Sequence, residues 1–377
     1  MYAHASTASV LTAQRMAAPV TQDKRKIKYF ILVLNPLCVR AARFHTVNQP
    51  LVIEDIDKPK VGEDEVLIKV KAAGMCYSDV HVIDGVIAAD PPVTLGHEIA
   101  GEVVEVGSEV KGIRSTDRVL VHFLNPCGKC RYCLQGHGMR CAYLFEREGY
   151  GFSDDGGYAE YCKVKADRLV ILPNDIPIEF AATLGCAGIT AYHAVKSIAR
   201  VRMSESIVIY GAGGVGLYAL QIAKAMGAYT IAVARSEERL RYAESLGADH
   251  VIKASGNIRR EVRRVTDGLG ADVVLDFVIT DESISNAIGM LANGGRVVLV
   301  GVSNKPISIN PQVTVLKEFS IAGSLVGNKD ELEELVKLAS KKRIRSIANR
   351  RFTLDEINDA LNMLRRGEII GRGYVVP

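Results

Sequence analysis

Hydrophobic and polar residues alternate along several short runs in the first half of the chain. Glu65–Lys71 and Gly101–Gly107 are two such runs, and turn-forming residues such as Pro59 and the Gly-Glu-Asp at 62–64 lie between runs. This alternation is typical of half-buried β-strands joined by turns. We therefore expect residues 39–188 to be rich in β-structure.

From residue 189 to 327 the pattern changes to short apolar runs that alternate with amphipathic ones. The apolar runs predict strands at Ser206–Tyr210, Thr230–Val233, Asp272–Leu275 and Arg296–Val300. The amphipathic runs predict helices, for example at Val215–Met226 and Ser236–Leu246, and two more follow at Lys329–Ser340 and Leu354–Arg366. Strand–helix alternation predicts an α/β fold with a doubly wound parallel sheet.

The composition is that of an ordinary globular protein, and 377 residues leave room for about two domains. No apolar run approaches the ~20 residues that span a bilayer. The net charge of +4 arises within residues 1–38, so the remainder of the chain is neutral. We therefore expect neither a nucleic acid nor a membrane as a partner.

Residues 1–38 differ in composition from the rest of the chain: the first part is rich in small polar residues, and the later part is rich in basic residues. We interpret them as an N-terminal extension outside the folded core, with Met16 as a possible alternative start of translation. An organellar presequence is the other interpretation.

Four of the eight cysteines fall within fifteen residues, with the spacing Cx2Cx2Cx7C: Cys127, Cys130, Cys133 and Cys141. Four thiolates so close together can surround one Zn²⁺ and leave no position for water, which predicts a structural zinc site. An iron–sulfur cluster, partial oxidation to disulfides and a DNA-binding zinc module are the alternatives.

A glycine-rich turn follows the predicted strand at Ser206–Tyr210 and precedes a predicted helix. It has the form GxGxxG and runs Gly211, Ala212, Gly213, Gly214, Val215, Gly216. Such a turn lets the backbone approach a pyrophosphate, and the helix N-terminus directs free N–H groups at it. Because the motif lies between a strand and a helix, we expect it to bind a dinucleotide.

The strand after this turn indicates which dinucleotide is bound. An NAD site usually has an acidic residue at the strand's end, but this strand ends in Ala234, Arg235 and Ser236. Arg235 and Ser236, with Arg239 one turn further on, would suit a 2′-phosphate. The sequence therefore favours NADP(H) over NAD(H).

Taken together, these motifs resemble the zinc-dependent alcohol dehydrogenases of the medium-chain dehydrogenase/reductase superfamily. The resemblance runs from about Val39 to Pro377. It includes Gly96-His97-Glu98, the four-cysteine segment, the glycine turn and Gly371-Arg372, in the family's order. It implies a GroES-like catalytic domain, residues 39–188 and 328–377, and a Rossmann domain, residues 189–327.

The resemblance also implies a second zinc ion, held by Cys76, His97 and Cys186, with its fourth position open to the alcohol. Glu98 is similar to the family carboxylate beside this metal, and Asp79 to the carboxylate that orients the histidine ring. Ser78 would take the alcohol proton and pass it through the cofactor ribose toward His81.

Three further positions are carried over from the family. Phe123 resembles the aromatic residue that lines the substrate pocket, although a plain core aromatic is nearly as good an interpretation. Thr190 would pack against the nicotinamide, and Arg372 would contact the pyrophosphate.

We therefore expect a cytoplasmic homodimer or homotetramer with two Zn²⁺ per chain that oxidises primary or secondary alcohols reversibly. A more specialised dehydrogenase, acting on polyols, threonine or cinnamyl-type alcohols, is an alternative. A zinc- and dinucleotide-binding protein without catalytic activity is another.

Overall fold

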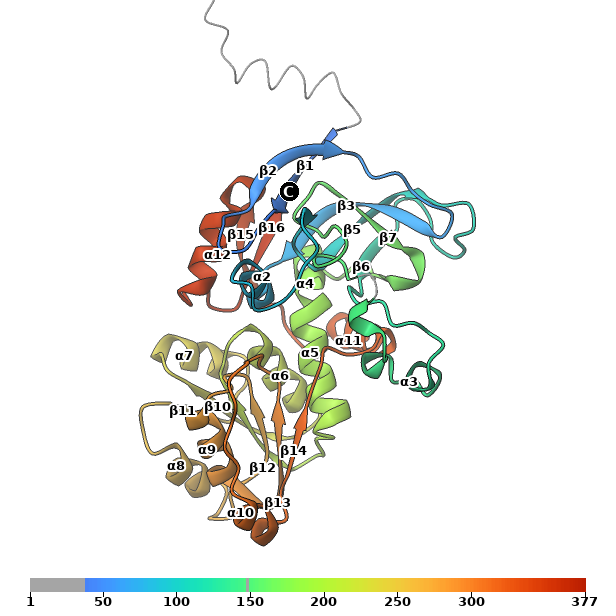
Figure 1. Ribbon diagram of the computed structural model, residues 1–377. Helices are drawn as coiled ribbons and strands as arrows, with labels where there is room; N and C mark the ends of the chain where they lie inside the picture. Colours follow the sequence, from blue (N-terminus) through green and yellow to red (C-terminus); the bar gives the residue numbers. More distant parts are fainter. Residues whose placement is uncertain (1–37, 147–148) are drawn as a thin grey trace, which may run out of the picture. The chain divides into compact units, whose positions relative to one another are not determined.

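The computed structural model describes residues 38–146 and 149–377, so the prediction for residues 1–37 lies outside the described part. Within this part, strands form a three-stranded, a six-stranded and a seven-stranded sheet (Figure 1). None of the helices in the described part is long and apolar enough to cross a membrane.

The six-stranded sheet is entirely parallel and has the order β11-β10-β9-β12-β13-β14. Its strands are β9 (Ser206–Tyr210), β10 (Tyr229–Ala234), β11 (His250–Lys253), β12 (Ala271–Asp276), β13 (Leu291–Leu299) and β14 (Ser320–Gly323). This order is that of a doubly wound sheet, which binds ligands where the order reverses, here beside β9. The four predicted strands are confirmed, and β11 and β14 were not predicted.

Both faces of this sheet are buried under helices. These are α6 (Gly214–Ala225), α7 (Glu237–Ser245), α8 (Ile258–Val265), α9 (Asp281–Met290) and α10 (Pro311–Lys317). Ile207 and Ile209 belong to the same core as the residues of α6, whereas Val208 and Tyr210 pack with those of α8 and α9. Burial on both faces explains why β9 is a continuous apolar run rather than an alternating one.

The seven-stranded sheet contains the strands that flank this parallel sheet in the sequence. Its order is β15-β16-β3-β5-β6-β8, and β7 pairs with β3. The strands are β3 (Glu65–Gly74), β5 (Glu98–Val106), β6 (Arg118–Val121), β7 (Tyr161–Lys165), β8 (Leu169–Ile171), β15 (Ala348–Thr353) and β16 (Arg372–Val376). Because β16 pairs with β3, the C-terminal segment returns to the sheet built by the first half of the chain.

Shorter elements complete the described part. The three-stranded sheet consists of β1 (Cys38–Phe44), β2 (Val52–Asp57) and β4 (Val93–Thr94). The remaining helices are α2 (Tyr77–Ile83), α3 (Arg131–Leu134), α11 (Lys329–Ser340) and α12 (Ile357–Arg365), with 3₁₀ turns η1 (Gly138–Arg140), η2 (Leu144–Glu146), η3 (Ala166–Arg168) and η6 (Leu354–Glu356).

The β-rich prediction is wrong for the end of the range 39–188, because a helical segment begins there at Ile178. It comprises α4 (Ile178–Thr183), the π-turn η4 (Leu184–Gly188), α5 (Ile189–His193) and the π-turn η5 (Ala194–Ile198). Its central residues, 180–189, are all buried, so this stretch lacks the amphipathic period that marks a surface helix. It packs against both β5 and α6 and therefore connects the two larger sheets.

Candidate active site

Four buried side chains from three distant parts of the sequence meet at one point. The ligand atoms of Cys76, His97, Glu98 and Cys186 all lie within 4.8 Å of one another. Cys76 caps the N-terminus of α2 just after β3, His97 immediately precedes β5, and Cys186 lies in η4. The structure thus brings the three predicted ligands of the second zinc ion together.

Gly74 leaves room for the carboxylate of Glu98, whereas a Cβ on Gly185 would lie at an ordinary van der Waals distance from the same residue. In the β3–β5 register Gly74 lies opposite Glu98, and a Cβ on Gly74 would be 2.0 Å from Oε2 of Glu98. A Cβ on Gly185 would lie 3.7 Å from Cα of Glu98. The carboxylate therefore occupies space that any side chain at 74 would fill, and Cys186 is held beside β5.

Asp79, to which the resemblance assigns the orientation of the histidine ring, lies beside His97. Nδ1 of His97 lies 3.2 Å from Oδ1 of Asp79, and both side chains are buried. On the other side of the ring, Nε2 has no hydrogen-bond partner among the described residues, and the same is true of Oε2 of Glu98. Buried polar atoms without partners are rare, and a cation held together with two cysteine sulfurs would satisfy them.

The electrostatics of the cluster also fit a cation. A hydrogen bond with Cys186 lowers the pKa of Cys76 well below its usual value, although burial opposes this. Burial alone would lower the pKa of His97, but the charge and hydrogen bond of Asp79 raise it well above its usual value. The surroundings therefore favour both a thiolate and a positive charge at the centre of the cluster.

Arg372 links this cluster to the glycine turn. Its guanidinium forms a buried ion pair with Glu98, and a Cβ on Gly214 would be 2.3 Å from its Cδ. Burial raises the pKa of Glu98 to about 7, against the lowering effect of Arg372. The sequence placed Arg372 at a pyrophosphate but did not predict its partner in the protein.

Of the other residues predicted for the site, Ser78 and Phe123 lie beside the four-residue cluster. Oγ of Ser78 lies 3.5 Å from Sγ of Cys76, and His81 is partly exposed one turn further along α2. The ring centroid of Phe123 lies 4.8 Å from that of His97. Thr190 is half-buried at the start of α5, which packs against α6.

The glycine turn has the geometry expected of a dinucleotide site. Gly211 has φ +109°, and a Cβ on Gly216 would be 2.1 Å from the carbonyl oxygen of Gly211. Nothing lies within 4 Å of a Cβ on Gly213, so the space in front of the turn is open. Gly214 and Val215 form the first residues of α6, whose N-terminal N–H groups are suited to a phosphate.

The three residues predicted to bind a 2′-phosphate lie at the end of β10, but they differ in their contacts. Arg235 and Ser236 are exposed, and Oγ of Ser236 accepts a hydrogen bond from the backbone N–H of Arg239. The guanidinium of Arg239 donates instead to the carbonyl oxygens of Gly367 and Ile369, at 2.8 and 3.1 Å. Arg235 is therefore the guanidinium most accessible to a ligand at this strand end.

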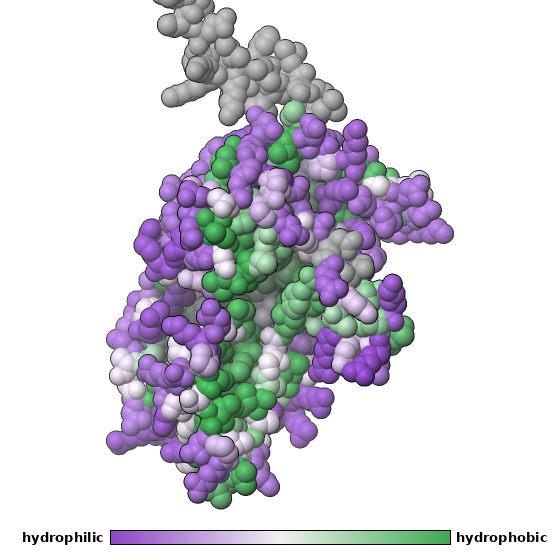
Figure 2. Space-filling view, in the orientation of Figure 1, coloured by the Kyte–Doolittle hydropathy of each residue, from purple (hydrophilic) through white to green (hydrophobic). Residues whose placement is uncertain are grey.

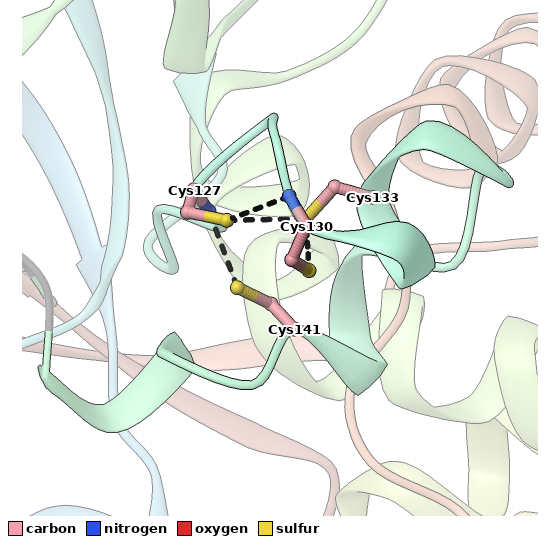
Figure 3. Close-up of side chains that lie close together, drawn as sticks. All are labelled: Cys127, Cys130, Cys133 and Cys141. Atoms are coloured by element: carbon pink, nitrogen blue, oxygen red, sulfur yellow. Dashed lines mark hydrogen bonds between the residues drawn. The ribbon is translucent and has the colours of Figure 1, made fainter.

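The four cysteines of the Cx2Cx2Cx7C segment converge on one point, with their sulfurs within 4.8 Å of one another (Figure 3). Sγ of Cys130 lies 3.5 Å from Sγ of Cys133, much longer than the ~2.05 Å of a disulfide. All eight cysteines lie within the described residues, and none of them forms a disulfide there. The described geometry is therefore that of a four-sulfur metal site and not of disulfides.

Backbone N–H groups point at these sulfurs and favour thiolates. Cys130 donates to Sγ of Cys127, and Cys127 donates to Sγ of Cys141, both at 3.3 Å. Such hydrogen bonds, led by one from the backbone of Cys133, lower the pKa of Cys130 to about 6. Asn328, which caps α11, accepts from the backbone of Met139 at 3.2 Å and thereby ties the segment to α11.

Two residues of the site escaped the sequence analysis. The hydroxyl of Tyr158 donates to Oδ2 of Asp79 at 2.8 Å. The ring centroid of Phe152 lies 5.0 Å from the ring centroid of His97. Gly156-Gly157 directly before Tyr158 is a sequence signal of close backbone approach that could have drawn attention to this segment.

Comparison with known proteins gives consistent results along the described part. Residues 62–174 match the family model of the alcohol dehydrogenase GroES-like domain, and residues 214–341 match that of the zinc-binding dehydrogenases. The chain is 38% identical to the NAD-dependent alcohol dehydrogenase of Sulfolobus acidocaldarius, over 89% of this chain and 98% of the relative.

A D-arabinose 1-dehydrogenase (NADP(+)) of Saccharolobus solfataricus is 33% identical over 91% of this chain and 99% of its own length. Among solved structures, the alcohol dehydrogenase of Aeropyrum pernix superimposes with a TM-score of 0.83 and 38% identity. That match covers 90% of this chain and 100% of the other.

Proposed function

The chain belongs to the zinc-dependent medium-chain alcohol dehydrogenase family, and we propose that it transfers hydride reversibly between a primary or secondary alcohol and NADP(H). The observation that carries this proposal is the convergence of Cys76, His97 and Cys186 beside the glycine turn, with Nε2 of His97 left without a protein partner. We assign residues 39–188 and 328–377 to the catalytic domain and residues 189–327 to the Rossmann domain.

Cys76, His97 and Cys186 would hold the catalytic zinc ion, with Glu98 adjacent to it. When bound, zinc supplies Lewis acidity that favours loss of the alcohol proton, and the nicotinamide accepts the hydride. Ser78 Oγ would accept that proton while its own hydroxyl proton passes through the cofactor ribose toward His81. His81, partly exposed on the same helix, would exchange it with solvent. Cys127, Cys130, Cys133 and Cys141 would hold a second, structural zinc ion.

Three features of the β10 end support a preference for NADP(H). No acidic residue stands at the strand tip, and the nearby Glu237 already pairs with Lys253, at 2.8 Å between Oε1 and Nζ. Arg235 is exposed there, and a guanidinium binds phosphate through paired hydrogen bonds. Gly213, Gly214 and the N-terminus of α6 would bind the pyrophosphate together with Arg372.

Phe123 and Phe152 support a preference for alcohols with an apolar chain over polyols. Their ring centroids lie 6.0 Å apart, and both rings flank that of His97. Two phenyl rings offer no hydrogen-bond partner to the extra hydroxyls of a polyol, which would lose water without compensation.

The exposed edge of the six-stranded sheet supports assembly into a dimer. β14 is the last strand in the sheet order, and Figure 2 shows hydrophobic surface on this side of the molecule. Exposed apolar side chains in the stretch of chain around β14 are Val302, Ile309, Val315, Leu316 and Leu325. Pairing of two such edges would cover them. We propose the cytoplasm as the location, because a reducing compartment would keep the cysteines of both clusters available to zinc.

The test measures zinc content and turnover of an alcohol panel with both cofactors. We expect two zinc ions per chain, and loss of one of them together with turnover in Cys76→Ala. Cys133→Ser should also lose one zinc ion but keep turnover in the folded fraction. Cys162→Ala is the matched control, because Cys162 is buried and lies outside both clusters. Unchanged turnover in Cys76→Ala would refute the catalytic assignment.

A further inference from the structure

Tyr158 is a fully buried tyrosine whose hydroxyl donates a 2.8 Å hydrogen bond to Oδ2 of the equally buried Asp79. We infer that Tyr158 is a positioning residue for the proposed zinc ligand His97. Its hydroxyl fixes the carboxylate of Asp79, and Asp79 in turn fixes the ring of His97. This inference rests on the proposed function, since it assumes that His97 is a zinc ligand.

The carboxylate of Asp79 is held by three donors. Oδ2 accepts from the backbone N–H of Cys76 at 3.0 Å and from Tyr158, and Oδ1 faces Nδ1 of His97 at 3.2 Å. Among the described residues the ion-pair partner of Asp79 is His97, with no lysine or arginine beside it. A buried carboxylate with no lysine or arginine beside it depends on such donors, so each of them restricts its orientation.

The same tyrosine also packs against the backbone that leads into His97. Gly96 has φ +90°, and a Cβ there would be 2.6 Å from Cδ1 of Tyr158. The ring and the hydroxyl thus act on His97 from two directions, one through the chain before it and one through Asp79. A phenylalanine would preserve the first contact and remove the second.

The segment around Tyr158 is itself anchored to the residues before His97. Gly156 donates to the carbonyl oxygen of Thr94 at 2.8 Å, and Tyr158 donates to that of Leu95 at 3.0 Å. A Cβ on Gly156 would be 2.5 Å from the carbonyl oxygen of Gly96, so only glycine permits this approach. The hydroxyl therefore projects from a rigid segment, as a positioning group requires.

The decisive variant is Tyr158→Phe. Without the hydroxyl, Asp79 can rotate toward its remaining donors and the ring of His97 loses its fixed direction. Residues that orient a metal-binding histidine typically alter metal affinity by about 10–100-fold. We expect the zinc ion at Cys76, His97 and Cys186 to bind at least about tenfold more weakly in competition with a chelator. The visible spectrum of the cobalt-substituted protein should change as well.

Two controls separate positioning from general stability. Tyr150→Phe removes another buried tyrosine hydroxyl, one that accepts from the backbone of Lys165 at 2.8 Å and does not contact Asp79. This variant should keep wild-type zinc affinity. The zinc ion of the four-cysteine segment should bind Tyr158→Phe as tightly as wild type. In an Asp79→Asn background, Tyr158→Phe should have little further effect, because both act through one carboxylate.

Wild-type zinc affinity and cobalt spectrum in Tyr158→Phe, with or without a lower unfolding temperature, would overturn the inference. If instead the wild-type protein bound only one zinc ion and Cys76→Ala did not change that number, the proposed function itself would fall, and this inference with it.

Discussion

Arg372 and Glu98 stand 274 positions apart in the sequence and form an ion pair that is buried on both sides. Arg372 also packs on Gly214 at the start of the dinucleotide helix. The side chain of Arg372 therefore contacts both the four-residue cluster and the glycine turn.

Arg372→Met is expected to destabilise the protein by about 3–5 kcal/mol, because a buried carboxylate is left without its partner. The double variant with Glu98→Gln should be more stable than the sum of the two single effects indicates. Denaturant unfolding of all four proteins measures this coupling. If the loss of unfolding free energy in the double variant equalled the sum of the two single losses, the ion pair would have no coupling energy.

Arg235→Asp should reverse the cofactor preference. The variant replaces a guanidinium near the expected 2′-phosphate of NADP(H) with a carboxylate that repels it. The same carboxylate can accept a hydrogen bond from the ribose 2′-hydroxyl of NAD(H). We expect kcat/KM for NADP(H) to fall by about 10–100-fold relative to that for NAD(H), as for loss of a charged hydrogen bond. Arg241→Asp is the matched control, because Arg241 is exposed on α7, the helix that begins just after Arg235 and Ser236, and this variant should leave the ratio unchanged.

Alanine substitutions at two glycines of the turn should have different effects, one on stability and the other on dinucleotide binding. Gly216→Ala places a Cβ 2.1 Å from a carbonyl oxygen and should destabilise the fold by about 1–3 kcal/mol. Gly213→Ala meets nothing within 4 Å and should keep wild-type stability while weakening dinucleotide binding. Thermal unfolding and cofactor titration of both variants separate the two effects. Equal unfolding temperatures would contradict the steric argument.

Glu331 should stabilise the protein only above acidic pH. Burial alone would raise its pKa, but hydrogen bonds from His193, Ser197 and the backbone of Asn328 lower it below the usual 4.5. Its contribution is therefore complete above pH 4.5 and is lost as the pH falls through the lowered value. The charge is worth about 1–2 kcal/mol near pH 7.

Glu331→Gln should accordingly be less stable than wild type at pH 7, with a difference that shrinks below pH 4.5. Denaturant unfolding across this pH range measures it. Glu333→Gln serves as control, since the half-exposed Glu333 forms only a 3.6 Å ion pair with Lys329 and should show little effect at any pH. A constant gap for Glu331→Gln down to pH 3 would contradict the assignment.

The local motifs could be predicted from the sequence because their geometry depends on residues that are close together in the chain. The four-cysteine segment spans fifteen positions, and its sulfurs meet as its spacing predicts. Gly211 has the positive φ expected of the tight turn between β9 and α6. Short-range strand and helix patterns in residues 206–246 were confirmed for the same reason.

The helical segment from Ile178 to Ile198 was missed because its central residues, 180–189, are buried throughout. Its apolar residues show no helical period, so the pattern did not distinguish it from the strands before it. Yet this segment carries Cys186 in a π-turn and brings it to β5.

The sequence by itself determined the strand–helix alternation of residues 206–246, the four-cysteine segment and the glycine turn, since neighbouring residues dictate these through spacing, propensity and backbone freedom. Only the tertiary structure decided that Cys76, His97 and Cys186 meet, that Arg372 pairs with Glu98, and that Tyr158 reaches Asp79. Those contacts join residues that are distant in the chain, and they depend on packing summed over whole sheets, which no local pattern contains.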